Sequence, residues 1–261
     1  MNLRAALGTE FLKSHRSGVP WLVALGYCAG PAIVGLFMII LKDPEAARSM
    51  GLISEKANLT AGEASWAAFF NMLEQMGAIA GTILFGMLTA WVFGREFSDR
   101  TVKELLAVPT SRAAIVLAKF LVVLGWTTAI SILIFGVGLI IGSLVQIPGW
   151  SWELLYASTV DFMGASILTI ALLPFVAFAA SFRRGPLPGV VWLFFAVVLA
   201  QVSAVIGWGD YVPWAVPALF SGAIGPRSTQ LGMHSYIILL SSSLIGILIT
   251  LLWWRNADQA R

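Results

Sequence analysis

Residues 114–145 read AIVLAKFLVVLGWTTAISILIFGVGLIIGSLV, and this stretch decides the fold class. A helix needs about 20 predominantly apolar residues to cross the hydrocarbon core of a bilayer, and this run is longer than that. Five other stretches are also apolar over a spanning length. The six predicted spans are Pro20–Leu41, Trp66–Phe93, Ala114–Val145, Leu154–Phe182, Val190–Gly207 and Leu231–Trp254. We therefore predict an all-α, polytopic membrane protein with six transmembrane helices.

The composition also indicates a membrane protein. Of 261 residues, 59% are hydrophobic and 11% are charged, whereas soluble domains carry about 25% charged residues. So few charges do not cover the surface of a water-soluble globule, so lipid is the expected solvent for most side chains. The length predicts one membrane domain over residues 1–261. The single cysteine, Cys28, excludes an internal disulfide, and His15 and His234 have no metal-ligand spacing, so we expect no metal site.

Lysine and arginine residues set the predicted orientation. With a cytoplasmic N-terminus, twelve of the sixteen lie on the cytoplasmic side, and only Lys42, Arg48, Lys56 and Arg227 lie outside. Cytoplasmic loops carry an excess of these residues. Because an even number of spans returns the chain to the same side, we predict that both termini are cytoplasmic. All tryptophans except Trp126 fall near the predicted membrane boundaries, where indole rings are enriched.

The N-terminal segment does not span but has an amphipathic pattern. Within residues 3–16, Leu3, Leu7 and Phe11 lie four apart with Ala6 on the same side, and basic residues supply the polar face. This pattern predicts an interfacial helix on the inner leaflet, within residues 1–18. The alternative is a short polar tail before the first span.

The segment before the last span is apolar but too short to cross. Residues 211–230 hold three prolines around the apolar piece 215–225, which falls well short of about 20 residues. We expect residues 208–230 to form a re-entrant hairpin in the outer leaflet or an interfacial helix.

No motif for chemistry of its own occurs in the sequence. The patterns G-x-x-x-x-G-K-[ST], G-x-S-x-G and H-E-x-x-H are all absent. We therefore predict no catalytic residue, and we expect that this chain does not itself hydrolyse ATP. The chain is not expected to be an enzyme.

The cytoplasmic segment 94–112 reads GREFSDRTVKELLAVPTSR. Thr101 and Glu104 have the spacing of a capping box, which begins a helix, and Pro109 ends it. Val102, Leu105 and Leu106 give this helix one apolar face. We predict a short helix held between spans two and three, where it can pass a push from a cytoplasmic partner into the membrane. The alternative is an ordinary amphipathic connector on the headgroups.

This segment resembles a loop of the type-2 ABC exporter permeases, with a pattern near E-x-x-x-G-T-x-x-x-L-L-x-x-P-x-S-R-x-x-x-x-x-x-K. The matching residues are Glu96, Thr101, Leu105, Leu106, Pro109, Ser111, Arg112 and Lys119. Arg100 departs from the pattern because it stands where glycine is usual. The predicted layout of interfacial helix, six spans and outer hairpin is also similar to that family.

The resemblance implies a permease that pairs with a second permease, identical or homologous, and docks on two cytoplasmic ABC ATPase subunits. ATP and Mg would bind the ATPase, with no cofactor in this chain. It implies a bacterial inner membrane, lipid surroundings and no nucleic acid partner. Within the coupling loop 94–113, residues 101–108 would be the coupling helix. The implied ATPase-coupling residues are Glu96, Thr101, Val102, Lys103, Glu104, Leu105, Leu106, Pro109 and Arg112.

Four polar residues lie inside predicted spans, namely Asn71, Glu74, Gln75 and Asp161. A charge at mid-membrane costs about 2.5–3.5 kcal/mol on insertion scales, so such groups usually face protein or water. They are candidates for a translocation path. Alternatively, long helices project beyond the lipid and leave these carboxylates among the headgroups.

Three G-x-x-x-G pairs predict close helix packing. They are Gly26 with Gly30, Gly77 with Gly81, and Gly138 with Gly142.

Our leading functional hypothesis is the permease subunit of an ABC exporter, moving an unidentified substrate outward with ATP hydrolysed by a separate subunit. One alternative is a secondary transporter or channel that works without an ATPase. Another is a membrane scaffold or sensor in which the loop docks a different protein.

Overall fold

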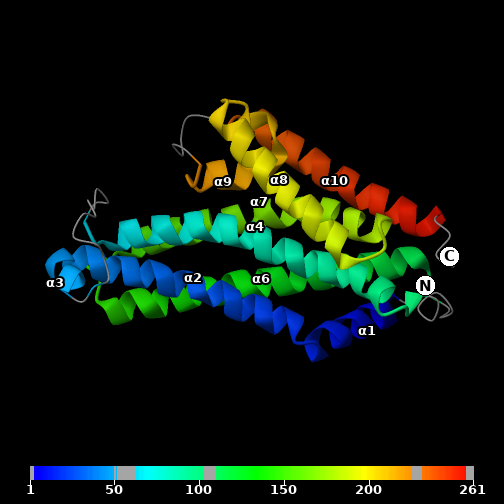
Figure 1. The fold of residues 1–261 in the computed structure, drawn as a ribbon, viewed down its shortest axis with the longest axis horizontal. Coiled ribbons are helices and arrows are strands. Elements are labelled where there is room, and N and C mark those ends of the chain that lie inside the picture. The colour runs from blue at the N-terminus through cyan, green and yellow to red at the C-terminus, as the bar shows by residue number, and fades with distance from the viewer. Residues whose placement is uncertain (1–2, 50, 52–62, 103–109, 225–230, 257–261) are drawn as a thin grey trace.

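The computed structural model describes residues 3–49, 51, 63–102, 110–224 and 231–256, and all regular elements in these ranges are helical (Figure 1). Six helices there are long and apolar enough to cross a membrane. They are α2 (Val19–Lys42), α4 (Trp66–Ser98), α6 (Arg112–Val145), α7 (Trp152–Phe182), α8 (Pro186–Val205) and α10 (Met233–Asn256). The prediction of an all-helical chain with six apolar helices of spanning length is confirmed for the described residues.

Serine residues begin three of the long helices. The hydroxyl oxygens of Ser65, Ser111 and Ser151 accept from the backbone N–H three residues later, at 3.2, 3.3 and 3.1 Å. Such caps satisfy donors that have no partner in the first turn. The helices also run further than hydropathy indicates, since α4 continues to Ser98 and α6 begins at Arg112. The connector between them is therefore 99–111, shorter than the predicted loop 94–113.

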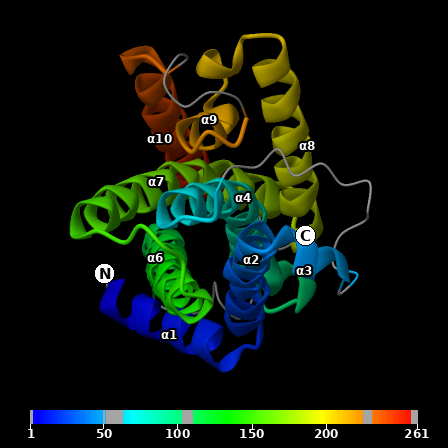
Figure 2. The ribbon, with the colours of Figure 1, turned by 90° about the vertical axis from the view of Figure 1, so that its left-hand side faces the viewer.

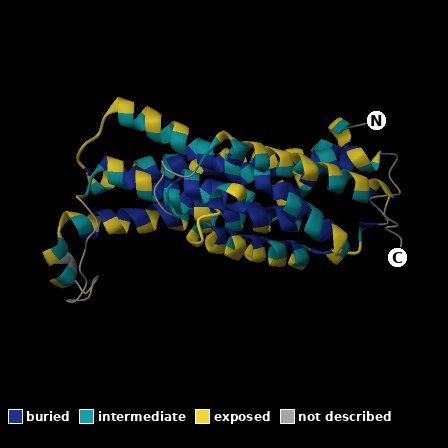
Figure 3. Cartoon of the chain, turned by 90° about the horizontal axis from the view of Figure 1, so that it is seen from above, coloured by how far each residue is buried: buried dark blue, intermediate teal, exposed yellow. Residues whose placement is uncertain are grey.

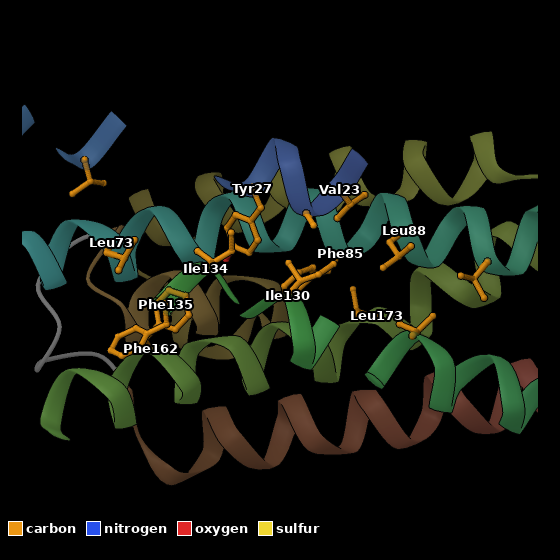
Figure 4. Packing of buried hydrophobic residues seen from close by; sticks show 14 of the residues in the cluster. Val23, Tyr27, Leu73, Phe85, Leu88, Ile130, Ile134, Phe135, Phe162 and Leu173 are labelled. Atoms are coloured by element: carbon orange, nitrogen blue, oxygen red, sulfur yellow. The ribbon is translucent and has the colours of Figure 1, made fainter. Parts of the chain in front are cut away.

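Helices α4 and α7 pack together at the centre of the bundle. In the end-on view, α1, α2 and α6 lie on one side of this pair, and α8, α9 and α10 lie on the other (Figure 2). Aromatic contacts fill the first side, with Tyr27 edge-on to Phe85 and Phe135 against Phe162 (Figure 4). The Tyr27 hydroxyl also donates to the carbonyl of Gly77 at 2.7 Å, which fixes α2 against α4.

The outer surface of the helices is apolar. Leu144 and Val205 are 77% and 84% exposed, and exposed residues line the outside of the bundle while buried ones follow its axis (Figure 3). A soluble monomer rarely exposes so extensive an apolar surface, whereas lipid solvates it readily. With six helices of spanning length, the chain is a multi-pass membrane protein.

Several short elements complete the described fold: α1 (Leu3–Arg16), α3 (Pro44–Ser49), η1 (Gly209–Tyr211), η2 (Pro213–Ala215) and α9 (Val216–Phe220). The last three belong to the predicted hairpin 208–230. Trp214, Val216 and Leu219 are buried there in a core shared with α7, α8 and α10. Asp210 Oδ2 lies 3.0 Å from His234 Nε2 near the start of α10. Residues 225–230 of the hairpin lie outside the described ranges.

Candidate functional site

Helix α4 ends in a turn that requires a left-handed residue. The N–H of Thr101 donates to the carbonyl of Glu96 at 3.0 Å, and the N–H of Arg100 donates to that of Phe97 at 3.4 Å. This pair of bonds is a Schellman motif, whose central residue is usually glycine. Here the central residue is Arg100, exposed and with φ at 58°. The departure from the family pattern noted in the sequence therefore falls where the backbone favours glycine.

We expect Arg100→Gly to stabilise the protein by about 0.5–1 kcal/mol. A left-handed non-glycine residue costs about 1–2 kcal/mol, and the extra entropy of glycine in the unfolded chain offsets about half of this. Unfolding of the purified protein in detergent measures the change. Arg100→Ala is the matched control, since it removes the same charge but keeps the strain. Equal stabilities of the two variants would contradict this explanation.

Eight of the nine predicted coupling residues lie in or beside the connector 99–111. Thr101 is half-buried and Val102 is buried. Arg112, at the start of α6, donates from its guanidinium to the carbonyls of Trp254 and Arg255, both at 3.3 Å, and so joins α6 to the end of α10. Lys103, Glu104, Leu105, Leu106 and Pro109 lie outside the described residues.

Glu96, the remaining predicted residue, belongs to a cluster of charges that joins three helices. Glu10 and Lys13 come from α1, Arg95 and Glu96 from α4, and Lys119 from α6. These five residues form the ionic junction. Lys119 Nζ lies 2.7 Å from Glu96 Oε1 and 3.0 Å from Glu10 Oε2, and it also donates to the carbonyl of Val92 at 2.8 Å. The two carboxylates therefore share one ammonium group.

Arg95 and Lys13 complete the ionic junction. Arg95 Nη2 lies 2.8 Å from Glu10 Oε2, and its Nε lies 3.2 Å from Glu96 Oε1. Lys13 Nζ lies 2.9 Å from Glu10 Oε1 and 3.4 Å from Glu96 Oε1. The guanidinium of Arg95 also lies over the ring of Trp91, 4.6 Å from its centre. Each carboxylate is therefore bound by all three cations.

Four members of the ionic junction are almost entirely buried. The Lys119 side chain is 0% exposed, Glu10 1%, Glu96 2% and Arg95 8%, whereas Lys13 is 36% exposed. Desolvating a charge costs several kcal/mol, which only close pairing offsets, so removing one partner of a buried pair typically costs about 3–5 kcal/mol. The ionic junction therefore holds α1, α4 and α6 in one arrangement.

The cations of the ionic junction lower the pKa of Glu10. Burial by itself raises the pKa of this carboxyl, but the charges of Lys119, Lys13 and Arg95 outweigh it and bring the pKa to about 2, from an ordinary value of 4.5. A pKa lowered by folding adds stability that is complete above the unfolded value and is lost as the pH falls toward the folded value. The window for Glu10 therefore runs from about pH 4.5 down to about pH 2.

We expect acid to weaken the wild-type protein more than the Glu10→Gln variant. At pH 3.5, the difference between the folded and unfolded pKa of Glu10 should lower the free energy of unfolding of the wild type by about 1.4 kcal/mol. The variant has no carboxyl at this position to titrate. Unfolding at pH 6, 4.5 and 3.5 measures the difference. Glu45→Gln, which removes an exposed carboxyl from α3, should retain the wild-type profile. Parallel profiles for wild type and Glu10→Gln would contradict the assignment.

Helix α1 is seated against α6 by its polar face. Ala6, Glu10 and Ser14, spaced four apart, are its buried residues, while Phe11 is exposed. Leu3 and Leu7, beside this buried row, are half-buried. Trp126 of α6 donates from its indole N–H to the hydroxyl of Ser14 at 3.0 Å. This contact accounts for the one tryptophan that fell away from the predicted boundaries.

Sequence reasoning missed Glu10 and the pairing of Arg95. Lys119 was noted only as the last residue of the loop pattern, although it is the one charged residue of the stretch 114–145. A charge within a span usually faces protein and has a partner, so Lys119 was the available signal. Nothing in the sequence indicated that Glu10 is the partner of Lys119, because the two residues are far apart along the chain.

The candidate translocation residues lie on α4 and α7, which pack together. Glu74 is buried within the bundle, Asp161 of α7 is half-buried, and Asn71 is on the exposed side of α4. The amide of Gln75 donates to the side-chain oxygen of Asn71. Gln75 also lines a groove of about 360 Å³ between α2 and α4.

Five of the six glycines from the G-x-x-x-G pairs lie against side chains. A Cβ on Gly77 would meet Phe162 at 2.7 Å, and one on Gly81 would meet the Tyr27 hydroxyl at 2.9 Å. Gly30 faces Met76, Gly138 faces Leu73 and Gly142 faces Trp66. Gly26 is exposed, with its nearest neighbour, Leu84, at 4.0 Å. These contacts join helices within the chain.

Within the described ranges, no group of three or more His, Cys, Asp or Glu side chains is placed to hold a metal ion. The ionic junction also does not resemble a catalytic site, because its carboxylates are occupied by cations and nearly closed to solvent.

Comparison with known proteins agrees with the resemblance seen in the loop. Residues 6–200 match the family described as ABC-2 family transporter protein. The chain is also similar to the bacitracin transport permease protein BCRB of Bacillus licheniformis, with 24% identity over 184 residues, covering 69% of this chain and 86% of that protein. The family match takes in the ionic junction and the connector 99–111. The resemblance is thus confirmed, and the chain belongs to the ABC-2 family of transporter membrane proteins.

Proposed function

We propose that this chain is the permease of an ATP-driven exporter, and that the ionic junction transmits the motion of a partner ATPase to α4 and α6. The observation that supports this proposal most directly is the salt bridge between Glu96 and Lys119, at 2.7 Å. It joins the two helices on either side of the connector 99–111. Because these charges are buried and each is multiply paired, they separate only at high cost. A force on the connector then displaces both helices together.

The proposal places the connector, α1 and the end of α10 on the cytoplasmic side. The predicted excess of lysine and arginine on that side supports it. These elements lie at one end of the bundle, because Arg112 bonds to the carbonyls at the end of α10 and α1 lies at the same end (Figure 1). On this orientation, the segment 208–230 is the outer re-entrant hairpin. The family resemblance and the bacterial relative support a bacterial inner membrane.

Family membership implies an ATPase partner. We further propose two ATPase subunits and a second permease in the complex, with residues 101–108 as the coupling helix and Lys103 and Glu104 at its contact with the ATPase. Glu74 and Asp161 are the candidates for the translocation path. Since one relative is a bacitracin permease by name, bacitracin is the first substrate to test for outward transport.

Charge reversal of the connector tests this function. The double variant Lys103→Glu/Glu104→Lys is expected to weaken co-purification with a co-expressed ABC ATPase and to lower ATP-dependent transport. Membrane insertion should be unaffected, because the net charge is unchanged. The double variant Glu45→Lys/Arg48→Glu in α3, whose exposed ion pair lies outside the connector, is the matched control.

Two outcomes would contradict the proposal. Unchanged docking of the Lys103→Glu/Glu104→Lys variant would remove these residues from the ATPase contact. Full transport by vesicles that contain the chain and no ATPase would instead favour the secondary transporter. A scaffold would show neither transport nor stimulated ATP hydrolysis under any condition.

A further inference from the structure

A second feature of the fold, separate from the ionic junction, is an apolar groove between the end of α7 and the start of α8. Its volume is about 640 Å³. The walls include Phe175, Phe178 and Phe182 from α7, and Leu187, Val191 and Phe195 from α8. From Phe175 to Phe182 the groove follows α7 for about 10 Å, at 1.5 Å per residue. This is a large part of one leaflet, whose hydrocarbon is about 15 Å deep.

One end of the groove is positively polarised. Arg183, which caps α7, lines the groove and is exposed. Within the part of the chain that the structure describes, its side chain forms no ion pair or hydrogen bond. Helix α8 begins beside it at Pro186, with no side-chain cap on its first turn. A helix N-terminus carries partial positive charge, but Pro186 and Pro188 have no N–H to donate, so the guanidinium of Arg183 is the group that would bind an anion here.

The apolar walls cannot by themselves select an occupant within a membrane, because lipid tails are as apolar as the side chains they would replace. Selection must come from the polar end of the groove. An arginine guanidinium matches a phosphate with two parallel hydrogen bonds. A ligand that fits the groove is therefore an amphiphile with one anionic end and an alkyl chain directed into the membrane.

We propose that this groove binds an anionic phospholipid, with its acyl chain along α7 and α8 and its phosphate on the guanidinium of Arg183, beside the start of α8. The lipid lies in the leaflet at the end of the bundle that holds the ionic junction, since the start of α8 packs against Gly94 of α4. It covers an aromatic surface and ties the α7–α8 corner to the headgroup layer.

Native mass spectrometry of the protein released from nanodiscs of equal phosphatidylglycerol and phosphatidylcholine tests the proposal. The wild type should retain phosphatidylglycerol in preference. In the Arg183→Gln variant, the preference for phosphatidylglycerol over phosphatidylcholine should be about fivefold lower. This is the change in affinity expected for the loss of one basic residue at an anionic lipid surface. Arg255→Gln, which removes an exposed arginine from the end of α10, is the matched control and should retain it.

A second variant tests the acyl site independently of charge. Val191→Trp fills the groove from an exposed position and should reduce retention of phosphatidylglycerol without unfolding the protein. Phosphatidylglycerol with a photoreactive acyl chain should label residues 175–195 in the wild type and not in Val191→Trp.

Three results would overturn the proposal. The first is an equal lipid preference in wild type and Arg183→Gln. The second is labelling confined to other parts of the chain. The third is efficient disulfide cross-linking of two copies through Phe195→Cys in a Cys28→Ser background, which would show that a second copy covers the groove.

Discussion

Lys119→Met is expected to destabilise the protein by about 3–5 kcal/mol and to abolish ATP-driven transport. The substitution keeps the length of the side chain but leaves Glu10 and Glu96 without the ammonium group that binds both, at 3.0 and 2.7 Å. A buried carboxylate that loses its partner carries an uncompensated desolvation cost of this size. Unfolding in mixed detergent micelles measures the stability, and uptake into inverted vesicles with the partner ATPase measures transport.

The ionic junction supplies its own controls. Lys13→Met removes a cation from the same carboxylates, but its side chain is 36% exposed, so the loss should be below about 1 kcal/mol. The double variant Lys119→Met/Glu10→Gln should be more stable than the sum of its single changes, by about 0.5–3 kcal/mol. Equal losses for Lys119→Met and Lys13→Met would show that burial does not decide the strength of the pairing.

Gly94→Ala is expected to destabilise the protein by about 1–3 kcal/mol, the usual cost of overpacking. A Cβ on Gly94 would lie 2.7 Å from Pro186 Cα and closer still to the backbone of Gly185 and Pro186. Backbone atoms cannot rotate away, so α4 and α8 must separate. Because Gly94 directly precedes Arg95 and Glu96, the shift also displaces the ionic junction, and we expect transport to fall more than protein level does.

Gly136→Ala, in the middle of α6, is the matched control. A Cβ there meets nothing within 4 Å, and alanine favours a helix over glycine by about 1 kcal/mol. This variant should therefore be as stable as the wild type or more so. A Gly94→Ala protein with wild-type unfolding and transport would contradict the close contact between α4 and α8.

The sequence by itself determined the six apolar helices and their approximate ends. The length of an apolar run is a local property, so each span can be recognised without knowing its neighbours. Ser65, Ser111 and Ser151 likewise begin helices through hydrogen bonds to residues only three positions away. The loop pattern from Glu96 to Lys119 was legible for the same reason. The position of Arg100 at the usual glycine was also visible, although its left-handed backbone was not.

Only the tertiary structure decided which charges meet. The sequence separates Glu10 from Lys119 by more than a hundred residues, yet their charged atoms lie 3.0 Å apart. From the sequence, Gly94 was predicted to begin a loop, whereas in the fold it lies within α4 at the contact with α8. Whether a charged group is buried and paired depends on the neighbours that distant helices bring to it, and no local pattern of residues records those neighbours.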